Sequence, residues 1–265
     1  MFIRTVNRAW ALTLIALSIL AAILGALALG YAFDFPLGQF VSDSPIWILA
    51  RVLGSIAILG AILYPIFALR KENYSTDHRK SPLSDFSVLL VASTLLLEAA
   101  STVLQYFFIL DKFLIALAVL AVLAILYCIL IFLRRQKSLV TILLGSCAAL
   151  WAGLETVHLF FDPDFTLVSP FRVYPPAAAA TLTLFLFYEV KNKKNPGKPY
   201  FLILLSALCG TLCTSVGGAC LISYLFAWNR VGITSMDDAW MLALGLYAFV
   251  RLIHLTTPSP HEQED

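Results

Sequence analysis

The chain has 265 residues, of which 60% are hydrophobic and only 13% are charged, and its mean hydropathy is +0.88. Soluble globular domains carry about 25% charged residues, so this composition excludes an ordinary soluble domain. The formal net charge is only +2, and the basic residues are not interleaved with aromatic ones in a patch, so no nucleic-acid partner is expected. We expect the lipid bilayer to be the main partner of this protein.

Long apolar blocks alternate with short polar connections, and each block is close to the ~20 residues that cross a bilayer core. The pattern predicts an all-α fold, a polytopic integral membrane helix bundle with eight transmembrane helices. One transmembrane domain is expected over residues 1–255, followed by a disordered cytoplasmic tail at 256–265. The predicted spans are 9–30, 46–69, 86–109, 112–133, 138–161, 171–190, 200–228 and 237–255.

The distribution of basic residues predicts the orientation of the bundle. With eight spans, all but four of the 18 Lys and Arg fall on the side that holds both termini. The positive-inside rule then places the N-terminus and the C-terminus in the cytoplasm of a multi-pass cell-membrane protein. The first span is longer than the 7–15-residue core of a signal peptide, so we expect it to be retained. The four exceptions are Arg51, Lys112, Arg172 and Arg230.

The second and third spans each contain an ionisable residue. Arg51 lies about one turn inside the second span, and Glu98 lies near the middle of the third, with Gln105 two turns further along the same face. Glu98 has two interpretations: a protonated acid that holds the bundle together by hydrogen bonds, or a group that carries a proton or neutralises a cationic substrate. The fourth span is nearly featureless, and we expect it to face lipid.

The fifth span has one polar face, on which Glu155 and His158 are three residues apart and Asp162 follows at its end. A charged residue at membrane depth costs about 2.5–3.5 kcal/mol on insertion scales, so it is expected to face the bundle interior or a watery cavity. Arg172 lies at the mouth of the sixth span. Together with Arg51 and Glu155 it forms either an ion-pair cluster that closes the outer end or the clamp of a site for an anionic substrate.

The spacing Glu155-x-x-His158 occurs in carboxylate-bridged metal sites, but those sites need a second such pair from a facing helix, and none is present. No Lys lies within a span to form a Schiff base, and no HExxH motif occurs. We therefore expect no metal, no cofactor and no catalytic residues.

We interpret the cysteines and the polar residues of the last two spans as structural. The five cysteines all lie in apolar blocks, which argues against disulfides, and Cys209, Cys213 and Cys220 share a face with small residues that favours close helix packing. Arg251 and His254 lie in the last turn of the eighth span, where the helix dipole and snorkelling favour cations.

Two functions from different classes remain. The first is a small transporter or permease component with an outward-facing polar cavity that contains Glu98 and the Glu155/His158 pair, with Gln105, Arg51 and Arg172 as further candidate ligand or proton-site residues. The alternative is a noncatalytic membrane subunit or sensor that acts through a bound lipid, a protein partner or a homo-oligomer. An integral membrane enzyme ranks third, because the sequence contains no recognisable nucleophile or metal motif.

Overall fold

The computed structural model describes residues 2–34, 39–41, 43–69, 81–133, 138–161, 172–194, 200–226 and 239–256. Over these ranges the chain forms eight α-helices, one π-helical turn and one pair of two-residue strands. The helices are α1 (Phe2–Tyr31), α2 (Pro45–Tyr64), α3 (Pro82–Ile109), α4 (Lys112–Phe132), α5 (Leu139–Phe161), α6 (Tyr174–Lys194), α7 (Tyr200–Leu225) and α8 (Ala239–Thr256). The π-helical turn η1 (Pro65–Leu69) continues α2, and strand β1 (Phe33–Asp34) pairs antiparallel with β2 (Gln39–Phe40).

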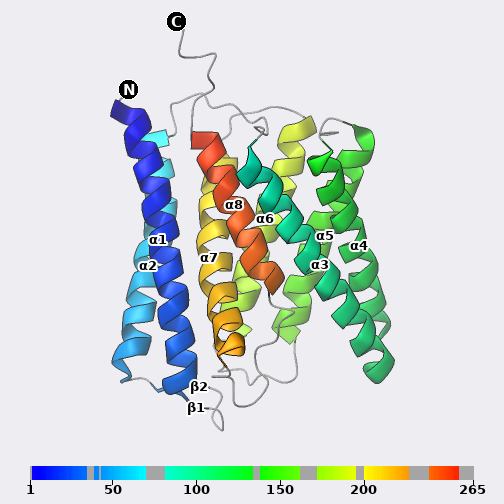
Figure 1. Ribbon diagram of the computed structural model, residues 1–265, viewed down its shortest axis with the longest axis horizontal. Helices are drawn as coiled ribbons and strands as arrows, with labels where there is room; N and C mark the ends of the chain where they lie inside the picture. Colours follow the sequence, from blue (N-terminus) through cyan, green and yellow to red (C-terminus); the bar gives the residue numbers. More distant parts are fainter. Residues whose placement is uncertain are drawn as a thin grey trace, which may run out of the picture.

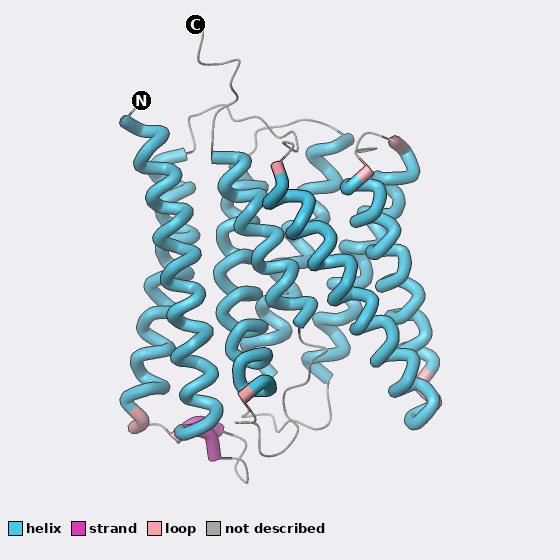
Figure 2. Tube along the Cα trace, viewed as in Figure 1, coloured by secondary structure: helices cyan, strands magenta, loops and turns pink. Residues whose placement is uncertain are grey.

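The eight helices run alternately up and down, so α1 begins and α8 ends at the same end of the bundle (Figure 1). We call this end the terminal end. The two strands lie at the opposite end, which we call the hairpin end (Figure 2). The arrangement confirms an all-α, multi-pass helical membrane protein. Which end faces the cytoplasm stays a prediction.

Seven of the eight helices are long and apolar enough to cross a membrane, and α6 is the exception. Its first turn is Tyr174-Pro175-Pro176, and its last two turns contain Glu189 and three lysines, so its composition is less apolar than that of the other helices. It nevertheless packs between α5 and α7 as an integral part of the bundle. The predicted tail at 256–265 lies outside the described residues except for Thr256.

The start of α3 differs from the predicted span, whereas its end at Ile109 and the start of α4 at Lys112 agree with the prediction. α3 begins at Pro82 and not at residue 86, because the Ser81 side chain accepts a hydrogen bond from the Ser84 amide at 3.1 Å and caps the first turn. At its other end Leu110 adopts a left-handed conformation (φ 57°), and Asp111 caps α4 by accepting from the Phe113 amide at 2.9 Å. Two residues thus reverse the chain between α3 and α4.

The centre of the bundle is the contact between α7 and α8, and it depends on glycine. A Cβ atom at Gly217 would lie 2.5 Å from the Leu242 amide nitrogen, and one at Gly245 would lie 2.6 Å from the Thr214 amide nitrogen. The two backbones therefore touch, which confirms the prediction of a small-residue packing face on α7. On its other side α7 packs against α1, and α2 packs outside them.

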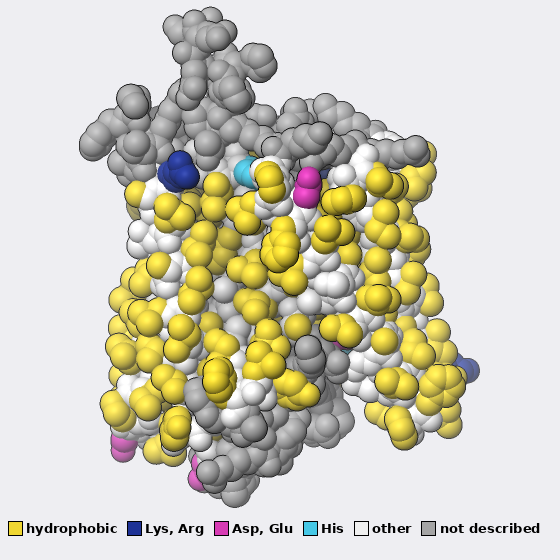
Figure 3. Space-filling view, in the orientation of Figure 1, with side chains coloured by type: hydrophobic (Ala, Val, Ile, Leu, Met, Phe, Trp, Pro, Cys, Tyr) yellow, Lys and Arg dark blue, Asp and Glu magenta, His cyan; other side chains and the backbone are white. Residues whose placement is uncertain are grey.

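The helical belt is covered by apolar side chains on the face drawn in Figure 3, and charged side chains lie near its two ends. α2 is the most exposed of the candidate spans, with 17% of its most apolar window buried against 78% for α8. A surface of this kind is stable only in an apolar solvent such as the bilayer.

Candidate functional site

A cavity of about 240 Å³ lies between α1, α2 and α7, and the first turn of α6 closes one side of it. The contributing stretches run from the hairpin end of these helices to about their middle. On α7 the lining extends from Cys220 to Thr211, a distance of about 13 Å at 1.5 Å per residue. We call it the α1/α2/α7 cavity.

Three aromatic side chains form the rim of the cavity at the hairpin end. The Phe40 ring on β2 stacks on the Trp47 ring of α2, with centroids 3.7 Å apart, and Tyr174 of α6 meets Trp47 edge-on at 6.2 Å. The strand pair holds Phe40 in this position. Aromatic rings of this kind are typical of the depth at which a membrane protein meets the lipid headgroups.

Arg51 lies one helical turn, about 6 Å, deeper than Trp47 and lines the cavity. Its guanidinium carbon is 5.7 Å from the centroid of the Trp47 ring, a cation–π contact. The side chain is exposed, and no carboxylate among the described residues forms an ion pair with it. An arginine at this depth without an acidic partner is able to attract an anionic group.

The inner wall of the cavity is apolar and contains a few hydroxyl groups. Small residues of α1 and α7 leave the space open, and a Cβ atom built on Gly54 of α2 would meet nothing within 4 Å. Thr211 is 1% exposed, and its hydroxyl has no hydrogen-bond partner within the part of the chain that the structure describes. Helical threonines ordinarily bond a carbonyl one turn back, so this buried hydroxyl departs from the usual pattern.

Of the six residues predicted for a ligand or proton site, only Arg51 lines this cavity. Arg172 is half-buried and lies two residues before Tyr174, which belongs to the rim. Whether Glu98, Gln105, Glu155, His158 and Arg172 act together in one site stays a prediction.

The structure brings Glu155 and His158 together on α5. Glu155 is 3% exposed, and its Oε1 is 3.5 Å from His158 Nδ1. The His158 ring lies 6.1 Å from the Phe113 ring of α4, so this pair is at the α4/α5 contact near the hairpin end. The other predicted member of this face, Asp162, lies outside the described residues.

Glu98 is buried in α3, with 8% of its surface exposed. Its Oε1 accepts a hydrogen bond from Thr102 Oγ1 at 3.1 Å, one turn further along the helix, whereas Thr94 bonds backbone carbonyls of its own helix. Gln105, two turns from Glu98, is exposed. The predicted polar stripe on α3 therefore divides into a buried acid and an exposed amide.

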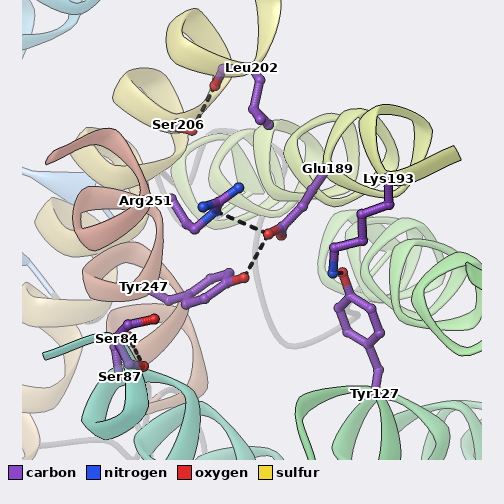
Figure 4. A network of polar contacts seen from close by, with 9 residues as sticks. All are labelled: Ser84, Ser87, Tyr127, Glu189, Lys193, Leu202, Ser206, Tyr247 and Arg251. Carbon is purple, nitrogen blue, oxygen red and sulfur yellow. Dashed lines mark hydrogen bonds and ion pairs between the residues drawn. The ribbon is translucent and has the colours of Figure 1, made fainter. Parts of the chain in front are cut away.

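The structure also reveals a buried polar network at the terminal end that we did not predict from the sequence. Glu189 of α6 accepts a hydrogen bond from Tyr247 at 2.7 Å and pairs with Arg251 Nε at 3.2 Å, both on α8 (Figure 4). One turn beyond Glu189, the Lys193 ammonium donates to the Tyr127 hydroxyl of α4 at 2.7 Å. We call these five residues the terminal-end network.

This network corrects the interpretation of Arg251 as a snorkelling cation at a helix end. Arg251 is 1% exposed, and so is Glu189. A buried guanidinium requires a charged partner, and the carboxylate of a neighbouring helix supplies it. The sequence does contain one signal for this network. Glu189 and Lys193 are four residues apart, and so are Tyr247 and Arg251, so each pair lies on one face of its helix.

No family model matches this chain, and no curated protein or solved structure matches it either. The fold and the composition define the class: a multi-pass, all-helical membrane protein with a small cavity in one half of the bundle.

Proposed function

We propose that this protein is a small transporter or permease component that takes an organic anion into the α1/α2/α7 cavity. The observation that supports this most directly is Arg51, a cation at membrane depth that lines the cavity and has no carboxylate partner among the described residues. Intramembrane cations that face a cavity commonly mark a substrate pathway. The charge distribution predicts that the cavity opens to the outside of the cell membrane.

Glu98 and the Glu155/His158 pair are proposed as the proton-binding groups of the same transporter. Glu98 lies in the central part of α3, and Glu155 lies near the hairpin end of α5. Both carboxyl groups are buried, and neither residue lines the cavity. A buried carboxyl group that exchanges a proton during transport changes the charge of the bundle by one unit. Substrate movement and proton movement would then be linked.

Transport can be tested in proteoliposomes adsorbed on a solid-supported membrane. Short alkyl sulfonates are suitable substrates for the screen, because they stay charged at every assay pH. We expect a transient current on their addition, and we expect Arg51→Gln to abolish it. Lys112→Gln is the matched control, since Lys112 is an exposed cation that does not line the cavity. A current that is the same for Arg51→Gln and the wild type would refute the assignment of the substrate site.

The role of Glu98 has its own test in the same assay. Glu98→Gln keeps an acceptor oxygen for Thr102 but cannot release a proton. We expect the pH dependence of the current to change in this variant, with the remainder carried by Glu155 and His158. If the pH dependence is unchanged, Glu98 is a structural acid.

The alternative function, a noncatalytic subunit or sensor, is supported by the position of the cavity beside α2, the candidate span that is most exposed to lipid. A ligand bound there lies next to a surface that a partner helix can reach. Saturable binding without any flux would favour this alternative over a transporter.

A further inference from the structure

We propose that the ligand of the α1/α2/α7 cavity is a single-chain amphiphile whose anionic headgroup binds Arg51 and whose apolar chain lies along α7 toward Thr211. This inference rests on the cavity being a ligand site, as proposed above, and it specifies the chemical class of that ligand. It does not depend on whether the ligand is transported.

The distribution of polarity along the cavity supports an amphiphile. Among the described residues of the lining, Arg51 is the one formally charged side chain, and it lies one turn below the aromatic rim, at the depth where a headgroup is found. From there inward the walls are Ala, Gly, Ile, Leu and Val side chains with isolated hydroxyls. A small, fully polar anion would leave this inner volume without a complementary partner.

The size of the cavity limits the ligand to one chain. Its 240 Å³ is below the range of about 300–1,000 Å³ that is typical of sites for drug-sized molecules. The Arg51 guanidinium has five N–H donors in a planar fork, which suits a phosphate, sulfonate or carboxylate headgroup. Thr211 lies at the far end of the lining and marks how deep the chain reaches.

A second hollow, of about 410 Å³ between α3 and α4, shows what distinguishes the cavity from ordinary lipid contact. Its described lining consists of apolar side chains and Tyr106, and none of these described residues is charged. Acyl chains of the bilayer fit against such a surface without any headgroup specificity. Of these two hollows, we therefore expect selectivity for an anionic headgroup in the α1/α2/α7 cavity.

The test is direct binding of radiolabelled dodecyl phosphate to the intact protein in nanodiscs, measured by scintillation proximity. Unlabelled dodecyl phosphate, dodecanol, dodecyltrimethylammonium and inorganic phosphate serve as competitors. We expect saturable binding that only dodecyl phosphate displaces. Competition by dodecanol as strong as that by dodecyl phosphate would overturn the role of the charge. Equal competition by inorganic phosphate would overturn the role of the chain.

Variants locate the binding. Arg51→Gln removes a charge-assisted contact, and we expect at least about tenfold weaker binding. Gly54→Leu places a side chain in the open space, and we expect it to abolish binding. Gly54→Ala is the control, because it raises helix propensity similarly but fills little volume, and we expect it to retain binding. Each variant is first shown to have the melting temperature of the wild type. Unchanged binding in folded Arg51→Gln and Gly54→Leu would overturn the proposal.

Failure here is distinguishable from failure of the proposed function. Binding of dodecyl phosphate without any transport current would support the proposed amphiphile site and refute the proposed transport function. Transport of short sulfonates without binding of dodecyl phosphate would support the transport function and refute the amphiphile site.

Discussion

Replacing Glu189 by Gln tests whether the terminal-end network stabilises the bundle. The substitution keeps the shape of the side chain and an acceptor oxygen for Tyr247, so the loss is confined to the charge that faces Arg251. With both residues 1% exposed and 3.2 Å between Arg251 Nε and Glu189 Oε1, the Coulomb attraction is about 5 kcal/mol at an effective dielectric constant of 20. Breaking a buried ion pair from one side typically costs about 3–5 kcal/mol.

We therefore expect Glu189→Gln to lower the free energy of unfolding by about 3 kcal/mol or more. The assay is reversible unfolding in mixed micelles, followed by tryptophan fluorescence as the denaturing detergent is increased. Lys194→Gln is the matched control, since Lys194 is exposed on the last turn of the same helix and its loss should change stability by less than about 0.5 kcal/mol.

The double variant Glu189→Met/Arg251→Met separates pairing from packing. Removing both charges also removes their desolvation cost, so it should destabilise the protein by less than the two single substitutions added together. Additive effects, or a cost below about 1 kcal/mol for Glu189→Gln, would show that Glu189 and Arg251 do not depend on one another and would refute the reasoning.

Three further predictions concern single positions and use the same unfolding assay. Thr211→Val should leave stability unchanged or raise it by up to about 1 kcal/mol, because the Thr211 hydroxyl has no partner among the described residues. Its control, Thr102→Val, should cost about 1 kcal/mol, because it removes the hydrogen bond to Glu98. Gly245→Val should cost more than about 3 kcal/mol, since its Cβ would displace the α7 backbone; a cost as small as that of Gly54→Val would contradict the close α7–α8 contact. Ser81→Ala should cost about 1 kcal/mol or more, because it removes both the N-cap of α3 and the 3.1 Å hydrogen bond between Ser81 Oγ and His254 Nε2, and Ser81→Asp should restore most of it.

The sequence predicted the helices well because apolar length is a strong signal in a membrane protein. Each of the eight predicted spans overlaps a helix of the bundle over most of its length. The ends were less accurate: the cap at Ser81 extends α3 to Pro82, and the two strands in the first connection were not expected. Side-chain capping and two-residue strands depend on local geometry that hydropathy does not contain.

The candidate site was predictable only in part, because partners on different helices cannot be assigned from spacing on one helix. Arg51 was recognised as unusual from its depth alone, and Glu155 and His158 are in contact as their spacing indicated. Glu189 was overlooked because it stood next to a run of lysines at the predicted end of a span. Its importance depends on Tyr247 and Arg251, and on how α6 and α8 are rotated toward each other.

The ion pair between α6 and α8 has a consequence for how the chain enters the membrane. During synthesis α6 leaves the ribosome before its partners do, since Tyr247 follows Glu189 by 58 residues. α6 is also the one described helix that is not apolar enough to count among the seven candidate spans. Until α8 arrives, the Glu189 side chain has neither Arg251 nor Tyr247 to compensate for its transfer into lipid. We therefore expect α6 to stay beside the translocation channel, or against α5, and to enter the bilayer together with the helices that follow it.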